Sequence, residues 1–107
     1  MTSKRDILSK YLPQGSVNLV FELLGKYPCS IKITRRRATK HGDFRRYRDG
    51  RVQISINNDP NPYRFLITLV HEFAHLVVYK NHKKVRPHGR EWQLTFQHLM
   101  LPFLSLE

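Results

Sequence analysis

Residues 63–80 read YRFLITLVHEFAHLVVYK, and the rest of the chain is best interpreted from this segment. Its apolar residues recur three and four positions apart, which is the period of one helix face. Because other apolar residues lie outside that stripe, we expect the helix to be largely buried. Asn61 is a typical N-cap residue, and Pro62 suits the first helical position because an N–H there has no helical partner. The inward stripe consists of Leu66, Leu69, Val70, Phe73, Leu76 and Val77.

The same segment contains the motif H-E-x-x-H, as His71-Glu72-Phe73-Ala74-His75. Residues four apart lie on one face of a helix, so both imidazoles can bind a single Zn²⁺. Glu72 lies beside the metal edge of the helix, where a carboxylate can act as the general base of a hydrolysis. The alternative is two histidines and a surface glutamate on an otherwise mostly apolar helix. We therefore predict a metal site with Glu72 as its base.

A catalytic zinc ion usually has three protein ligands, so a third one must come from elsewhere in the chain. His82 is two helical turns beyond His75, roughly 10 Å along the axis, which is too far unless the helix breaks. His88 follows a loop that contains Pro87 and precedes a new helix, so the loop can fold it back to the metal. We favour His88, with Glu91 as the alternative. The candidates considered are His82, His88, Glu91 and His98.

The remaining segments predict an α+β fold, with two helices, then three strands, then two helices. Residues 30–34 and 51–56 alternate between apolar and polar side chains, as half-buried strands do. Asp49-Gly50 separates residues 43–48 from residues 51–56 and is a strong hairpin signal, because both residues can take positive φ. We expect a single domain over residues 1–107, with a small three-stranded antiparallel sheet against the H-E-x-x-H helix.

Composition narrows the class of protein. The chain has 107 residues, with 19 Lys and Arg against 8 Asp and Glu, a formal net charge of +11. This balance makes an anionic partner the expectation, and a hydrophobic content of 40% excludes a basic disordered tail. The single Cys29 excludes an internal disulfide and a four-cysteine zinc ribbon. Because no segment resembles a membrane span or a signal peptide, we expect a cytoplasmic protein without a membrane partner.

The positive charge is concentrated in residues 32–51 and in residues 80–90. In the first cluster Tyr47 lies among arginines, which combines phosphate-binding donors with a ring that could stack on a base. The plain alternative is a solvated basic face of the sheet. If DNA binds, we expect backbone contacts that weaken with salt and do not read the base sequence. The candidate residues are Arg35, Arg36, Arg37, Arg45, Arg46, Tyr47, Arg48, Lys83, Lys84 and Arg86.

Two motifs together resemble the SprT-like family, which includes the bacterial SprT proteins and the Spartan proteases. The first is His71-Glu72-x-x-His75, and the second is the downstream segment 88–92, HGREW, which is similar to the family's H-G-x-x-F/W. The resemblance covers about residues 29–100. It implies a minimal zincin fold, one Zn²⁺ bound by His71, His75 and His88, and Glu72 as general base.

The resemblance also implies proteolysis, which Spartan performs on proteins trapped on DNA during the repair of DNA–protein crosslinks. Two other functions are compatible with the sequence: a nucleic-acid-binding zinc module without proteolytic activity, and a general peptidase that does not depend on DNA. SprT-like proteins often carry a C-terminal zinc ribbon, which residues 1–107 lack. We therefore expect the sequence to be an N-terminal fragment of a longer chain.

Overall fold

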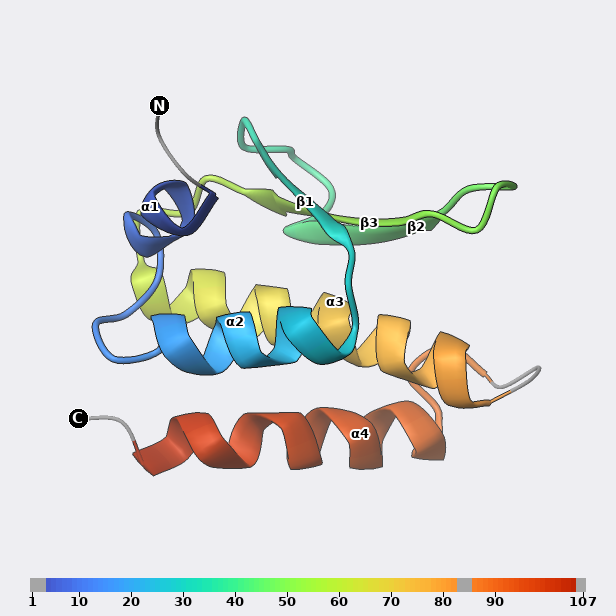
Figure 1. Ribbon diagram of the computed structural model, residues 1–107. Coiled ribbons are helices and arrows are strands. Elements are labelled where there is room, and N and C mark those ends of the chain that lie inside the picture. The colour runs from blue at the N-terminus through green and yellow to red at the C-terminus, as the bar shows by residue number, and fades with distance from the viewer. Residues whose placement is uncertain (1–3, 83–85, 106–107) are drawn as a thin grey trace.

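The computed structural model describes residues 4–82 and 86–105, and it is an α+β, zincin-like domain (Figure 1). Lys83 and Lys84, two of the candidate DNA contacts, lie outside the described residues. None of the helices in the described part is both long and apolar enough to cross a membrane. The elements are α1 (Lys4–Ser9), α2 (Val17–Lys26), β1 (Ser30–Thr34), β2 (Gly42–Arg46), β3 (Val52–Asn57), α3 (Pro62–Asn81), α4 (Arg90–Met100) and a 3-10 helix, η1 (Leu101–Ser105).

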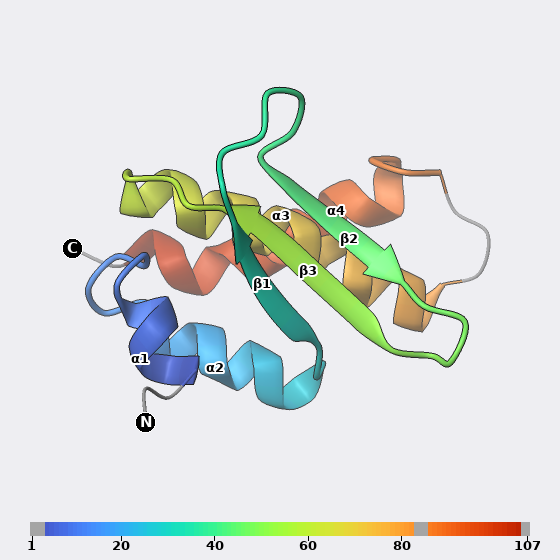
Figure 2. The same cartoon turned by 90° about the horizontal axis from the view of Figure 1, so that it is seen from above.

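The elements form layers, with α3 in the middle of the molecule. The sheet covers one side of α3 and α4 lies along the other, while α2 runs beside α3 beneath β1 (Figures 1 and 2). The core lies between α3 and β3, where the largest side chains are at most 1% exposed. These include Phe65, Leu69, Phe73, Leu76, Ile54 and Ile56.

Helix α3 begins as the sequence predicts. The side chain of Asn61 accepts hydrogen bonds from the backbone N–H groups of Tyr63, at 3.0 Å, and Arg64, at 3.2 Å. Pro62 occupies the first turn, where an N–H would have no partner inside the helix. The helix is fixed at its start by these contacts and then runs for 20 residues, so the H-E-x-x-H motif lies in its interior.

The sheet differs from the expectation in one respect. Its strand order is β1-β3-β2, and β2 pairs with β3 in the predicted antiparallel hairpin. Strand β1, however, pairs with β3 in parallel. The prediction of a fully antiparallel sheet was therefore wrong. The connector of residues 35–41 crosses the end of β3 and leaves one strand's width between β1 and β2. Strand β3 fills that space after the hairpin has reversed the chain, and it therefore runs parallel to β1.

The hairpin turn also differs in detail. Gly50 has a φ of +92°, but Asp49 does not have a positive φ. The Tyr47 N–H donates to the Arg51 carbonyl at 2.9 Å, and the Gly50 N–H donates to the Tyr47 carbonyl at 3.1 Å. The turn is therefore longer than the two-residue turn predicted, and only its glycine needs the left-handed conformation.

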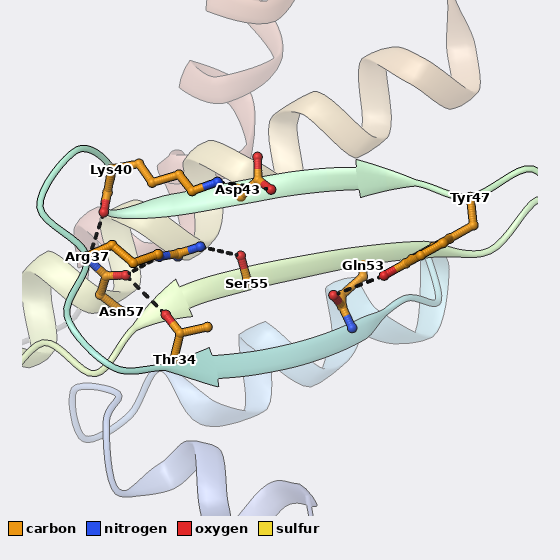
Figure 3. A network of polar contacts seen from close by, with 8 residues as sticks. All are labelled: Thr34, Arg37, Lys40, Asp43, Tyr47, Gln53, Ser55 and Asn57. Atoms are coloured by element: carbon orange, nitrogen blue, oxygen red, sulfur yellow. Dashed lines mark hydrogen bonds and ion pairs between the residues drawn. The ribbon is translucent and has the colours of Figure 1, made fainter.

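Asn57, at the end of β3, holds the connector of residues 35–41 in place (Figure 3). Its Oδ1 accepts hydrogen bonds from the Thr34 hydroxyl, at 3.1 Å, and from Arg37 Nε, at 2.7 Å. Its Nδ2 donates to the Lys40 carbonyl at 2.8 Å. Because Asn57 is only 4% exposed, these bonds form away from bulk water, and they fix the position from which β2 starts.

Candidate metal centre

His71 and His75 lie one turn apart on α3, with ring centroids separated by 5.2 Å. Both side chains are half-buried and face the beginning of α4, where they contact Trp92. This pairing follows from the helix alone, because residues four apart share a face. The fold therefore places the two imidazoles on one side of a long helix, as expected.

His88 reaches the same point from a tight turn. The Gly89 N–H donates to the Arg86 carbonyl at 3.0 Å, which closes a turn with Pro87 and His88 at its centre. His88 has a φ of +59°, the left-handed region that residues with a Cβ rarely adopt. Proline followed by a residue of positive φ defines a type II turn. The turn therefore holds His88 in a strained conformation, a feature typical of functional positions.

The three histidines converge through the same ring atom. The Nε2 atom of His88 lies 3.0 Å from that of His75 and 3.1 Å from that of His71. The three residues form a group whose ligand atoms all lie within 4.8 Å of one another. A tetrahedral Zn²⁺ with Zn–N bonds of 2.0–2.1 Å would place its nitrogen ligands about 3.3 Å apart. The three imidazoles could therefore bind one metal ion, and their donor set suits zinc.

Burial favours the protonation state that a metal requires. It lowers the pKa of His75 to about 4, with a further contribution from the neighbouring His88 and His71. The pKa of His71 is also lowered, first by burial and then by His88. Since only a neutral imidazole has a lone pair for a metal, both side chains are prepared to bind a cation at neutral pH.

Glu72 lies beside the cluster but is not part of it. Its Oε2 is 3.9 Å from the Nε2 of His71, and the residue is only 7% exposed. Burial raises its pKa to about 7; the carboxylate of Asp43 adds to this, whereas the positive charges of Arg37 and Lys40 oppose it. A carboxyl group with such a pKa can accept and return a proton near neutral pH.

Helix α4 supports the cluster through residues that sequence reasoning did not assign to it. Trp92 packs against the H-E-x-x-H helix at the cluster itself. Its ring stacks on His75, with centroids 5.5 Å apart, and its Nε1–H donates to the His71 carbonyl at 3.3 Å. Phe96 in turn stacks on Trp92, with ring centroids 5.2 Å apart. Gln93 Nε2 donates to the His88 carbonyl at 3.1 Å and so holds the strained turn.

The other candidate ligands lie elsewhere. His82 caps the end of α3 and is exposed, and His98 lies on α4 at a groove formed with α2. Among the described residues, the group of side chains close enough to bind one metal ion contains His88 and not Glu91. Pro87 and Gly89, on either side of His88, were the sequence signal for its turn. Gln93 had no comparable signal, because its role depends on a carbonyl that faces it only in the folded chain.

The described basic candidates do not form one uniform surface. Arg35, Arg36, Arg45, Arg48 and Arg86 are exposed. Arg37 is half-buried instead, since its Nε binds Asn57 and its Nη1 donates to Ser55 Oγ at 3.1 Å. The guanidinium of Arg46 lies 4.9 Å from the ring centre of Tyr79, and that of Arg51 lies 5.1 Å from the ring centre of Tyr47.

Comparison with known proteins gives short but close matches. A stretch of 34 residues is 53% identical to "Protein SprT" of Actinobacillus succinogenes, and 34 residues are 50% identical to "Protein SprT" of Vibrio parahaemolyticus. A 30-residue stretch is 47% identical to "Protein SprT" of Yersinia enterocolitica. These stretches cover 31%, 31% and 28% of this chain, and 20%, 21% and 18% of the relatives, so the matches span about a fifth of each relative's length. No solved structure matches the chain.

The family assignment rests on a longer alignment. The model of the SprT-like family matches residues 17–103, from the start of α2 into η1. That range includes the three histidines, Glu72 and all three strands. The resemblance noted in the sequence is thereby confirmed, and the chain belongs to the SprT-like family.

Proposed function

We propose that the chain is a SprT-like peptidase core that uses one Zn²⁺ to hydrolyse peptide bonds in proteins associated with DNA. The observation that carries this proposal is the convergence of the His71, His75 and His88 Nε2 atoms beside the buried carboxyl group of Glu72. A bound Zn²⁺ would supply a Lewis acid that polarises the scissile carbonyl and makes water a better nucleophile.

The roles of the protein side chains follow from their positions. His71, His75 and His88 would hold the ion. Glu72, 3.9 Å from the His71 ring, would take the proton of the attacking water and return it to the leaving amine. Trp92 orients the α3 histidines by stacking on one and by bonding to the backbone of the other.

Substitution of Glu72 tests the proposed base. Glu72→Gln preserves the size of the side chain but removes the group that accepts a proton, so we expect zinc binding to persist and hydrolysis to fall by at least 10²-fold. The measurement is cleavage of an unfolded protein substrate, with metal content determined in parallel. Glu91→Gln is the matched control, because Glu91 lies at the start of α4 outside the cluster. Full activity of Glu72→Gln would show that Glu72 is not the base.

The association with DNA rests on the exposed arginines of residues 35–48 and on the net charge of +11. Phosphate contacts by such side chains release counterions, so we expect DNA binding to weaken steeply as salt increases. If the enzyme acts on DNA-associated proteins, DNA should accelerate cleavage of a DNA-binding substrate and have little effect on a substrate that does not bind DNA. Equal rates with and without DNA would favour a DNA-independent peptidase.

The same exposed charges support a second candidate, a nucleic-acid-binding zinc module without hydrolytic activity. This candidate predicts salt-dependent DNA binding with no cleavage of any protein substrate. The buried Glu72 argues against it, because a purely structural zinc site needs no proton acceptor beside its ligands. Wild-type protein loaded with zinc distinguishes the two in a single cleavage assay.

A further inference from the structure

A pocket of about 440 Å³ opens directly beside His75, on the side of the cluster away from Glu72. Its size is within the range typical of sites that enclose a ligand group. The pocket is lined by β2, the end of α3, the turn before α4 and the first turn of α4, so its lining comes from four parts of the chain. Its lining includes Phe44, Arg46, Val78, Tyr79, Arg86 and Trp92.

One part of this pocket's lining is apolar and largely aromatic. The rings of Phe44 and Tyr79 contact each other with centroids 6.0 Å apart, and Trp92, which stacks on His75, forms a further wall. Val78 is 6% exposed and lies among them. Aromatic walls of this kind suit a flat or bulky apolar group, which gains both burial and ring contacts.

The ionisable side chains that line the pocket are basic residues. Arg46 extends over the Tyr79 ring at 4.9 Å, and the exposed Arg86 and His82 also line the pocket. Among the described residues, no acidic side chain lines it. A cationic group would therefore meet like charge on entering and, among the described residues, would find no carboxylate to pair with.

The space on the other side of the cluster has a different character. A smaller pocket of about 280 Å³ lies beside His71 and Glu72. There β2 approaches α3 so closely that a Cβ on Gly42 would lie 2.8 Å from Thr68 Cγ2. Since Gly42 and Phe44 belong to the same strand, a polypeptide crossing the cluster beside β2 would pass both pockets. The larger, aromatic one has more room to select a side chain.

We propose that the Phe44–Tyr79–Trp92 pocket is a specificity site for a large aromatic or aliphatic side chain of the substrate, and that Arg46 excludes lysine and arginine from it. This inference rests on the proposed peptidase function, because it assigns the occupant as part of a polypeptide that crosses the histidine cluster. It adds a preference beside the cleaved bond that neither the three histidines nor Glu72 determines.

A binding experiment tests the site without requiring cleavage. Zinc-loaded Glu72→Gln protein is titrated with a set of fluorescent peptides. The peptides share one sequence except at a single test position, which holds Phe, Ala or Lys, and the test position is varied along the peptide. At one position we expect Phe to bind about tenfold more tightly than Ala, and Lys to bind more weakly than Ala. Tyr79→Ala, in the same background, should remove most of the preference for Phe. A flat profile at every position would overturn the proposal.

A charge-matched pair of variants tests the role of Arg46. Arg45 and Arg46 are adjacent and exposed, but only Arg46 lines the pocket, because successive strand residues face opposite sides. Arg46→Glu should improve binding of the Lys peptide by up to about fivefold, whereas Arg45→Glu, with the same change in net charge, should leave the profile as it was. Equal effects of the two variants would mean that overall charge acts, and would overturn the assignment of Arg46.

The outcomes separate this inference from the proposed function. If the wild type hydrolyses peptides at equal rates whatever residue is placed beside the cleaved bond, the peptidase function stands and the specificity site is refuted. If Glu72→Gln shows the binding preference but the wild type cleaves no peptide, the pocket is supported and the peptidase function is refuted.

Discussion

The two parts of the histidine cluster are built in different ways. His71 and His75, with Glu72 between them, form a helical half that sits inside a 20-residue helix with a well-formed N-cap. His88 forms a turn half, exposed and held at a φ of +59° by a hydrogen-bonded turn. The helical half obtains its geometry from the regular backbone of α3. The turn half depends on local strain and on contacts with α4, so it is the part where small changes should disturb metal binding first.

Removing a ligand from either half should have the largest effect. We expect His75→Ala and His88→Ala each to weaken zinc binding by more than the 10- to 100-fold that loss of an outer hydrogen-bond partner costs. Competition with a chelator of known affinity measures this, and His98→Ala should bind zinc as the wild type does, because His98 lies outside the cluster. Unchanged zinc binding by His88→Ala would remove the turn half from the site.

Within the helical half, the pH dependence of stability tests the environment of Glu72. Its folded pKa of about 7 lies above the ordinary value of 4.5, so its contribution to stability is complete below pH 4.5 and is lost as pH rises through 7. In zinc-free protein, Glu72→Gln should therefore gain stability relative to wild type across this window, by at most about 1.4 kcal/mol per pH unit.

Urea unfolding of both proteins at a series of pH values gives this difference directly. The contributions of His71 and His75 are common to the two proteins and cancel. Parallel stability profiles for the wild type and Glu72→Gln would contradict the burial of a neutral carboxyl group at this position.

The next largest effect is expected on stability, where β2 lies close to the helical half. In Gly42→Ala, the new Cβ would lie 2.8 Å from Thr68 Cγ2 and 3.1 Å from both Glu72 Cγ and the Ser55 carbonyl oxygen. Overpacking of this kind costs about 1–3 kcal/mol in the free energy of unfolding. Gly25→Ala is the matched control, since a Cβ there meets nothing within 4 Å, and it should stabilise α2 by about 0.5–1 kcal/mol. Thermal unfolding that ranks the two variants in the opposite order would refute the contact.

The smallest effect is expected when Gln93, which supports the turn half, is replaced. Gln93→Ala removes the hydrogen bond to the His88 carbonyl, and we expect zinc affinity to fall by about tenfold, the lower end of the range for an outer partner, with little change in stability. Gln97→Ala, one turn further along the exposed side of α4, is the control and should leave affinity unchanged. If both variants bind zinc equally well, the turn keeps its conformation without Gln93.

The same contrast explains what could be predicted from the sequence. The period of α3 and its cap at Asn61 involve residues at most four positions apart, so local rules place His71 and His75 together. The hairpin of β2 and β3 is equally local, and it was predicted. His88 was favoured over Glu91 because of its loop, and its turn has a local cause in Pro87 and Gly89. The approach of its Nε2 atom to His75 and His71, 13 and 17 positions away, depends instead on the folded chain.

Long-range pairing accounts for the differences. The parallel pairing of β1 with β3 depends on the connector that crosses the end of β3, and alternation within a strand gives no information about its neighbour. Arg37 was placed on a basic surface because its neighbours are arginines. The structure turns it onto the sheet, since the side chains of Asn57 and Ser55, 20 and 18 positions away, supply its hydrogen-bond acceptors.

The position of β3 between β1 and β2 has a consequence for how the chain folds as it is made. In the described part of the chain β1 pairs only with β3, and each residue of β1 pairs with one 23 positions later. These partners have not yet been synthesised when β1 leaves the ribosome. The strand that carries Ile31 and Ile33 therefore has no pairing partner until the β2–β3 hairpin has formed. The hairpin is therefore expected to form first and β1 to dock onto it last, which makes β1 the strand most exposed to mispairing on the ribosome.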